Sequence, residues 1–361
     1  MSTVLKVLDE INKHGFKAYI VGGYVRDFIL GIHSSDIDIC TDATPKDIKD
    51  IFNNVELPRD NYSAVRLYIK NYTFDIMTFR KEISYYNNRK PMEIEYIKDL
   101  KEDLLRRDFT MNSLCMDKDG NIIDLLNAKE DILNKTIRVI GDPDTKFKED
   151  PLRILRAIRF YTTLDFNFSD GVIDSIKNNK QELSRLSLIR KKEELDRIFI
   201  SPNSKKGVKL LIDLGIDKEL KLDFSNCHLN SDLIGIWASI GIYDDYPFTK
   251  NERNIIKRIK ELCDKDVLSP INLYEYGLYI SSIVGDLKGI SRKKITEKYE
   301  KLPIKTRTDI DINAEQIIEV LNIEPSKKIS IIYDDLINKI LCDKLENNYN
   351  EIVKYIVSNY K

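Results

Sequence analysis

Apolar residues in the first third of this chain follow the short spacing that is typical of β-strands. The runs "KAYIVGG" (17–23) and "DIDICT" (36–41) each predict one strand. The stretch "SAVRLYIKNYTFDIMTFR" (63–80) predicts two more, joined at residues 70–71 in the outline of a hairpin. This part of the chain therefore predicts a mixed sheet.

Helical signals lie between these strands. The stretch "YVRDFILG" (24–31) predicts a short helix closed by a glycine. Thr44 followed by Pro45 is a strong N-terminal signal for a helix in "TPKDIKDIFNN". The opening twenty or so residues have the pattern of an amphipathic helix, because charged residues interrupt the apolar run that a signal peptide needs.

After about residue 131 the helical period dominates. Apolar residues recur at i, i+3 and i+4 in "EDPLRILRAIRFYTTL" (149–164), "KKEELDRIFI" (191–200) and "KKGVKLLIDLGI" (205–216). The predicted fold is an α/β head, with a mixed sheet and flanking helices, followed by an all-α neck, body and tail. The predicted boundaries are 1–135, 136–200 and 201–361.

Composition excludes several classes of protein. The net charge of −1 gives no overall attraction for nucleic acid, so such a partner would need a local basic face. Five scattered cysteines without CxxC spacing and only three histidines argue against a disulfide framework or a zinc site, and predict buried free thiols. No apolar run approaches the ~20 residues that span a bilayer. We expect a cytoplasmic protein without membrane contact.

Three aspartates are the strongest chemical signal. On a strand Asp36 and Asp38 point to one face, while Ile37 and Ile39 point to the other. Asp75 stands in a second strand pattern, between apolar neighbours. If the two strands are adjacent, three carboxylates can hold two Mg²⁺ ions for phosphoryl transfer. The alternative for an isolated DxD is a solvated strand edge.

Gly22 and Gly23 end a predicted strand and open a predicted helix. In such a turn, backbone N–H groups can approach a polyphosphate that a Cβ would obstruct, and Arg26 lies one turn further on. Ordinary turn chemistry explains most glycine pairs. The order strand, Gly-Gly, helix, strand, DxD is more specific, because it places an anion site beside a metal site.

With these motifs the chain resembles the nucleotidyltransferases of the polymerase-β superfamily, and among them the class II tRNA CCA-adding enzymes. The resemblance spans most of the chain and is thin between about 215 and 300. It is carried by "GGYVRDFILG…DIDICTDATP", "RRDFTMNSL" and "RVIGDPDTKFKEDPLRILRAIRF", and less strongly by "LPIKTRTDIDINAEQIIEVLNIEP". Asp75 stands where relatives often have glutamate.

The resemblance assigns nucleotide-binding roles to "RRD" and to "EDPLR". It implies that Arg107 and Asp108 contact the ribose and triphosphate; the alternative is that Asp108 caps a helix that begins at Phe109. It also implies that Asp150 and Arg153 act as a protein template for the incoming base. The alternative there is a helix cap followed by a solvated basic stripe, Arg153, Arg156 and Arg159. We include Arg156 and Arg159 among the expected nucleotide-binding residues.

Base chemistry agrees with a template of one carboxylate and one guanidinium. Cytosine and adenine each present an amino donor beside a ring-nitrogen acceptor, whereas uracil and guanine reverse that pattern. The pair Asp150 and Arg153 can therefore admit C and A and reject U and G. In this family a flexible loop is the candidate switch between C and A. Residues 80–96 occupy its place, and an ordinary surface loop is the alternative.

A basic cluster follows in the predicted neck. Arg190, Lys191 and Lys192 stand at a predicted helix start, where they could follow the phosphates of an acceptor stem or form a solvated helix face.

The resemblance implies template-independent addition of CCA to tRNA 3′ ends, from CTP and ATP, with two Mg²⁺ ions and release of pyrophosphate. The head would be catalytic, the neck would recognise the base, and the body and tail would bind the acceptor stem and elbow. Alternatives on the same fold are an A-adding enzyme and a bacterial-type poly(A) polymerase, which tends to have a long basic C-terminal extension that is absent here. The alternative from another class is an inactive RNA-binding protein, which would be expected to lack one of the three acids. The sequence predicts no oligomeric state.

Overall fold

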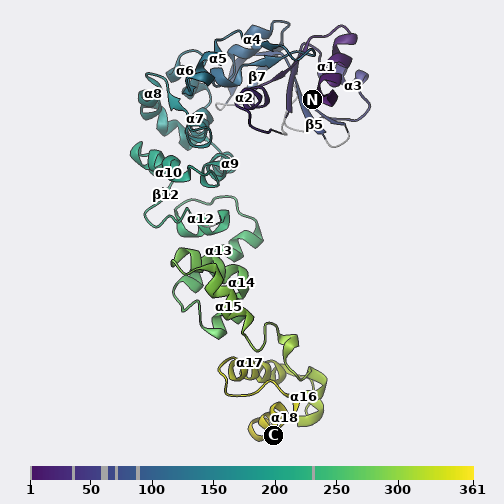
Figure 1. Ribbon diagram of the computed structural model, residues 1–361, viewed down its shortest axis with the longest axis vertical. Coiled ribbons are helices and arrows are strands. Elements are labelled where there is room, and N and C mark those ends of the chain that lie inside the picture. The colour runs from purple at the N-terminus through teal and green to yellow at the C-terminus, as the bar shows by residue number, and fades with distance from the viewer. Residues whose placement is uncertain (1, 35–36, 58–63, 70–71, 87–89, 230–231) are drawn as a thin grey trace. The chain divides into compact units, whose positions relative to one another are not determined.

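A computed structural model of the chain describes residues 2–34, 37–57, 64–69, 72–86, 90–229 and 232–361 (Figure 1). For residues 82–86 and 90–93 it describes the backbone alone. The chain divides into two compact units, Met1–Lys221 and Leu222–Lys361.

A mixed sheet forms the centre of the first unit, as predicted. Its order is β3-β4-β5-β2-β1-β8-β9, with β2 and β5 parallel and the other neighbours antiparallel. The strands are β1 (Ala18–Val21), β2 (Ile37–Thr41), β3 (Val55–Glu56), β4 (Ala64–Ile69), β5 (Tyr72–Thr78), β8 (Cys115–Met116) and β9 (Ile122–Ile123).

The two faces of this sheet differ in polarity. Residues in register on neighbouring strands point to the same face, so Ile39 and Ile76 share one face, where both are buried. Asp38 and Asp75 are also in register with each other, and Asp75 is in register with Arg66 on β4. These three residues therefore share the opposite, polar face.

Two amphipathic helices pack against the sheet and against each other (Figure 1). They are α1 (Ser2–Lys13) and α3 (Pro45–Ile51). The predicted cap of α3 is confirmed: Thr44 and Asp47 form a reciprocal capping box, with Pro45 in the first turn. A third helix, α2 (Gly23–Ile29), follows the glycine pair.

Residues 80–96 do not form the loop that was expected. They form an antiparallel hairpin of β6 (Arg80–Tyr86) and β7 (Lys90–Tyr96), with register shifts on either side of Ser84. The polar Asn-Asn-Arg at 87–89 lies outside the described residues. Composition misled the prediction here, because alternation of apolar and polar residues on both arms favours strands even in a polar segment.

The rest of the first unit is helical. Helix α7 (Leu152–Thr163) packs on α9 (Leu188–Phe199) and α10 (Ser204–Asp213). Helix α7 begins one residue later than an Asp150 cap predicts, although the Asp150 carboxylate accepts a hydrogen bond from the Leu152 N–H. The other elements are α4 (Leu100–Leu105), η1 (Thr110–Asn112), α5 (Ala128–Leu133), β10 (Thr136–Ile137), α6 (Pro143–Glu149), β11 (Asn167–Phe168), α8 (Val172–Asn179), η2 (Lys180–Arg185) and α11 (Ile216–Glu219).

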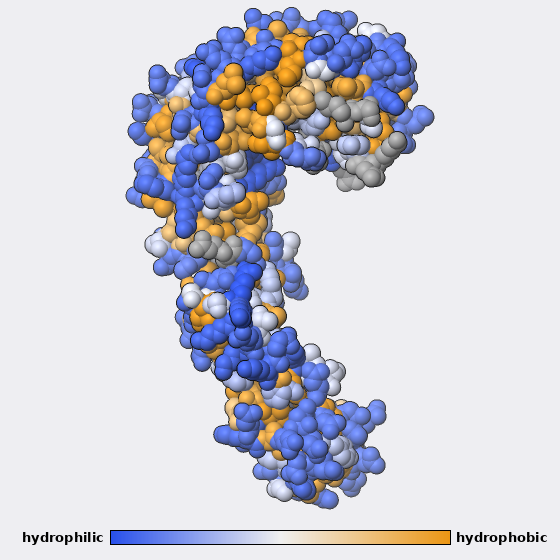
Figure 2. All heavy atoms as spheres, viewed as in Figure 1, coloured by the Kyte–Doolittle hydropathy of each residue, from blue (hydrophilic) through white to orange (hydrophobic). Residues whose placement is uncertain are grey.

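Helices make up nearly all of the second unit. Ile332 and Leu336 of α17 are fully buried, in a cluster that Ile317 of α16 and Ile352 of α18 complete. Hydrophilic residues cover much of the visible surface of this unit (Figure 2). Its elements are β12 (Leu222–Asp223), α12 (Leu233–Ser239), β13 (Gly241–Ile242), α13 (Lys250–Cys263), α14 (Pro270–Leu287), α15 (Arg292–Glu300), η3 (Arg307–Asp309), α16 (Ala314–Leu321), α17 (Lys327–Leu341) and α18 (Tyr349–Tyr360).

The five cysteines are free, as predicted, but only Cys40 and Cys115 are buried. Cys227 and Cys263 are partly exposed and Cys342 is exposed, so the prediction of buried thiols was wrong for these three. Among the helices that the structure describes, none is both long and apolar enough to span a bilayer.

Candidate active site

The first unit contains a pocket of about 730 Å³ between the sheet and the first helices of the neck. Of the residues that the structure describes, nine arginines and four aspartates line it, an excess of positive charge that suits a polyanion. The aspartates are Asp27, Asp38, Asp108 and Asp150, and the arginines are Arg26, Arg80, Arg106, Arg107, Arg153, Arg156, Arg159, Arg190 and Arg197. Every predicted nucleotide-binding residue lines this pocket.

The glycine turn lies directly beside Asp38. Gly22 has φ of +82°, which a residue with a side chain rarely adopts, and a Cβ there would lie 3.7 Å from Asp38 Oδ2. The Gly22 N–H donates to the Leu114 carbonyl at 3.2 Å. The N–H of Gly22 is therefore engaged within the protein and is not one of the backbone N–H groups that could face a polyphosphate.

Two of the three carboxylates of the predicted metal site, Asp38 and Asp75, are neighbours on adjacent strands. Asp38 and Asp75 are in register on parallel β2 and β5, so their side chains share the polar face of the sheet. Asp36 lies outside the described residues. The described residues contain no group of three or more possible metal ligands, so Asp38 and Asp75 supply two carboxylates of the kind that a hard divalent cation prefers.

Asp75 also has a protein partner. Its two carboxylate oxygens accept hydrogen bonds of 2.8 and 3.1 Å from Arg66 Nε and Nη2. The pair is about two-fifths exposed, with 44% of the Arg66 side chain and 37% of the Asp75 side chain accessible. The hydrogen bond and charge of Asp75 raise the pKa of Arg66 further above its usual value. A metal ion that bound Asp75 would therefore have to displace Arg66 or bind beside it.

A buried acid that the sequence did not single out holds the arginines of "RRD". Asp103, on α4, accepts hydrogen bonds of 2.8 Å from Arg106 Nε and 3.3 Å from Arg107 Nη2, and has no exposed surface. Burial raises the pKa of Asp103, but Arg107 and Arg106 lower it more, so that it lies below its usual value. The only sequence signal for Asp103 is its spacing of three and four residues from these arginines on a predicted helix.

Asp108 is not the cap of a helix beginning at Phe109. The following 3₁₀ turn, η1, has Phe109 at its N-cap, whereas the Asp108 carboxylate accepts from Arg156 Nε at 2.6 Å and from Asn112 Nδ2 at 3.1 Å. Burial opposes ionisation, but Arg156 and the hydrogen bonds lower the pKa of Asp108 to about 2. Asp108 is therefore ionised at neutral pH, between the head and α7.

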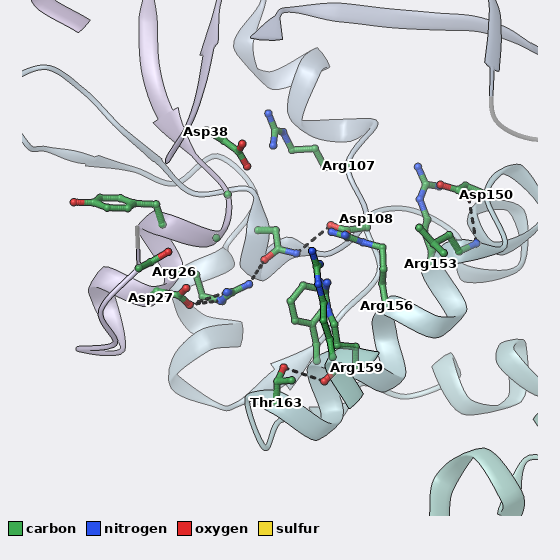
Figure 3. Close-up of a pocket in the computed structure, with 18 of the residues that line it drawn as sticks. Arg26, Asp27, Asp38, Arg107, Asp108, Asp150, Arg153, Arg156, Arg159 and Thr163 are labelled. Carbon is green, nitrogen blue, oxygen red and sulfur yellow. Dashed lines mark hydrogen bonds and ion pairs between the residues drawn. The ribbon is translucent and has the colours of Figure 1, made fainter. Parts of the chain in front are cut away.

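Asp150 and Arg153 lie on the opposite side of the pocket from Arg26 and Asp27 (Figure 3). Arg153 donates to the backbone carbonyls of Arg106 (2.9 Å) and Lys146 (3.1 Å) and to Glu149 (3.2 Å). Arg190 Nη1 lies 3.7 Å from Asp150 Oδ1. Arg153 is thus no part of a solvated stripe.

The basic residues of α9 were predicted to form either a phosphate-binding cluster or a solvated helix face, and they form neither as a group. Arg190 lines the pocket, Lys191 is buried, and Lys192 pairs with Asp196 at 2.8 Å. They are neither one exposed basic patch nor a solvated helix face, because successive helix positions point in different directions.

A second acid that the sequence did not indicate, Glu194, balances the basic residues of α7. Arg159 Nη1 lies 3.2 Å from Glu194 Oε2, and both side chains are buried. Burial and the charge of Arg156 lower the pKa of Arg159 to about 10. The ring of Phe160 lies under the Arg159 guanidinium at 4.3 Å, an arrangement that cation–π attraction favours.

Comparisons with known proteins find relatives over nearly the whole chain. Family models match residues 18–138 as a poly A polymerase head domain, 165–225 as "Probable RNA and SrmB-binding site of polymerase A", and 249–356 as tRNA nucleotidyltransferase domain 2. The CCA-adding enzyme of Ligilactobacillus salivarius is 31% identical over 97% of this chain and 94% of its own. That of Staphylococcus haemolyticus is 30% identical over 98% and 97%.

Solved structures share the fold. The Bacillus stearothermophilus CCA-adding enzyme in complex with CTP has a TM-score of 0.86 at 24% identity, covering 98% of this chain and 96% of its own. The Thermotoga maritima CCA-adding enzyme, complexed with tRNA, has a TM-score of 0.71 at 22% identity, covering 99% and 95%. By its full-length similarity to the curated relatives, the chain belongs to the family of CCA-adding enzymes.

Proposed function

We propose that this chain adds CCA to the 3′ ends of tRNA, using CTP and ATP. The observation that carries the proposal is one pocket that contains the glycine turn beside Asp38, the Asp108–Arg156 pair, and Asp150 with Arg153. These groups suit a triphosphate, a ribose and a base in that order. Family membership makes tRNA the acceptor, and with tRNA as substrate we expect a cytoplasmic location.

The reaction joins the 3′-oxygen of the RNA to the α-phosphorus of the nucleotide and breaks the bond to pyrophosphate. Asp36, Asp38 and Asp75 would hold two Mg²⁺ ions, which when bound supply charge stabilisation and activate the attacking hydroxyl. Arg26 and Arg107 lie at the end of the pocket near the glycine turn, where they would neutralise the phosphates.

The ribose and base would bind to side chains that are already fixed in place. Arg107 and the ionised Asp108 suit a ribose hydroxyl, which both donates and accepts. Among the described residues, the bonds of Arg153 use three of its five N–H donors, so two suit the ring nitrogen of C or A. Asp150 would accept the exocyclic amino proton, which U and G do not offer at that position.

The division of labour along the chain follows from the same proposal. Residues 1–135 would catalyse the transfer, residues 136–200 would read the base, and residues 201–361 would bind the body of the tRNA. The hairpin at 80–96 would adjust the base site between C and A.

The test supplies tRNA that ends at the discriminator base, with Mg²⁺ and each nucleotide separately. We expect two additions with CTP alone and three with CTP and ATP, resolved on a sequencing gel. Addition of A only to tRNA that already ends in CC would establish an A-adding enzyme instead, and a long A tract a poly(A) polymerase. Retained tRNA binding without addition would indicate an inactive RNA-binding protein.

A further inference from the structure

One buried amide in the pocket lies between a cation and an anion. Asn112, the last residue of η1, accepts a hydrogen bond from Arg26 Nη1 on its Oδ1 at 2.6 Å. Its Nδ2 donates to Asp108 Oδ1 at 3.1 Å. Only 7% of Asn112 is exposed, so water cannot readily replace either contact. The sequence did not mark Asn112, although its place four residues after Asp108 lets the two side chains meet.

The two contacts of Asn112 belong to a longer chain of hydrogen bonds, whose ends, Arg26 with Asp27 and Asp108 with Arg156, are labelled in Figure 3. At one end Arg26 also donates to Asp27 Oδ1, at 2.8 Å from Nε and 2.7 Å from Nη2. At the other end Asp108 Oδ2 accepts from Arg156 Nε at 2.6 Å. The chain therefore joins α2, which follows the glycine turn, to α7, which carries Arg153.

An aromatic ring joins the same two helices. Phe160, on α7, has the guanidinium of Arg26 at 5.2 Å and that of Arg156 at 5.6 Å from its centroid. The two cations at the ends of the polar chain thus share one ring, within cation–π distance. Ion pairs, hydrogen bonds and cation–π contacts therefore connect α2 of the head with α7 of the neck.

The chemistry at position 112 requires an amide. A side chain between a guanidinium and a carboxylate must accept on one side and donate on the other, and asparagine does both. Aspartate has the same shape but no donor, so it would keep the contact with Arg26 and repel Asp108. Alanine would leave both partners without this contact.

We propose that Asn112 is a positioning residue for nucleotidyl transfer, holding the glycine turn and the base-reading helix α7 in one fixed relation. This inference rests on the proposed function. With Asn112 in place, the triphosphate at the turn and the base at α7 are aligned together; without it, each half of the nucleotide still finds its binding groups but in the wrong relation. Misalignment of this kind lowers kcat more than it raises KM, because binding energy remains while reactive geometry is lost.

The experiment compares Asn112→Asp and Asn112→Ala with a matched control on the same 3₁₀ turn. The control is Thr110→Val, because Thr110 is equally buried and donates to Asp131 at 2.6 Å, away from the pocket. The assay measures kcat and KM for CTP on tRNA, and the ratio of kcat/KM for UTP to that for CTP. The ratio does not depend on the folded fraction, so loss of stability alone leaves it unchanged.

We expect Asn112→Asp to lower kcat on the order of 10²-fold, with a smaller rise in KM. The UTP to CTP ratio should rise about tenfold in both Asn112 variants, and stay within about threefold of wild type in Thr110→Val. The inference is wrong if the Asn112 variants keep the wild-type kcat and UTP to CTP ratio. It is also wrong if Thr110→Val changes this ratio as much as they do. Neither result affects the proposed function. A wild-type protein that adds no nucleotides to tRNA would refute the proposed function, and this inference with it.

Discussion

The two units of the chain bury different kinds of side chain. Among the described residues, the first unit buries eight charged side chains, whereas the polar side chain that the second unit buries is Ser281. The second unit keeps ion pairs such as Arg292–Asp286 near its surface, with 59% of the Arg292 side chain exposed. The eight buried charges are Arg26, Asp103, Asp108, Asp131, Arg153, Arg159, Lys191 and Glu194.

This difference distinguishes the unit that contains the candidate active site from the second unit, whose described core is almost entirely apolar. A buried charge is expensive in free energy unless it is paired, and a pair often stabilises less than apolar packing would. Six of these eight charges, all except Asp131 and Lys191, line the pocket or pair with residues that line it, as Asp103 does with Arg107. The second unit packs isoleucines and leucines around Ile332 and Leu336 in the conventional way. Buried, paired charge therefore marks the reactive region of this molecule.

The largest difference in stability between the two regions should follow removal of Asp103. In Asp103→Leu two arginines in the buried site lose their shared carboxylate, and loss of one partner of such a group costs about 3–5 kcal/mol. We expect the free energy of unfolding from urea titration to fall by about this amount. A loss below about 1 kcal/mol would show that the buried and surface ion pairs are equivalent.

A smaller effect, on selectivity, should follow from Arg153→Ala. The guanidinium that favours C and A is lost, so incorporation of UTP relative to CTP should rise on the order of tenfold, while tRNA binding changes little. Primer-extension kinetics with each nucleotide measure this. Unchanged selectivity would remove Arg153 from the base-reading role and leave its contacts with the backbone as purely structural.

The Asp108–Arg156 pair gives a defined pH dependence. In the folded protein the pKa of Asp108 is lowered to about 2. The ionised carboxylate therefore stabilises the folded state fully above the unfolded pKa of about 4, and this contribution is lost as pH falls toward 2. The difference in unfolding free energy between wild type and Asp108→Asn should be constant from pH 8 to about 5, then shrink by about 2 kcal/mol at lower pH. A difference that instead changes near pH 7 would contradict the assignment.

The smallest effect is expected in the second unit. In Asp286→Asn a surface ion pair with Arg292 is lost, and such pairs contribute about 0–1 kcal/mol. Urea titration should show a change within that range, with CCA addition unaffected. If the free energy of unfolding fell as much as in Asp103→Leu, buried and surface ion pairs would not differ in their contribution to stability.

Local patterns predicted much of the fold and of the site. Short motifs predicted the strands β1, β2, β4 and β5 and the capping of α3. The family resemblance that these motifs carry predicted nucleotide-binding roles for Asp108 and Arg153, and both line the pocket. The hairpin at 80–96 was missed because a polar composition was given more weight than alternation.

The residues that the sequence did not reveal act across long separations. Asn112 meets Arg26 across 86 positions and Glu194 meets Arg159 across 35. No periodicity within one element specifies such partners, since they arise only when α2, η1, α7 and α9 pack together. Asp103 had a helical spacing to Arg106 and Arg107, but nothing local showed that it would be buried.

The most direct test of the reactive region is Asp38→Ala, measured by C addition to tRNA lacking CCA, with tRNA affinity measured beside it. Loss of one of the three proposed metal-holding carboxylates should lower the rate on the order of 10³-fold or more, with tRNA affinity within a few-fold of wild type. Turnover close to that of wild type would contradict this role of Asp38, because nucleotide transfer in the pocket would then not depend on its carboxylate.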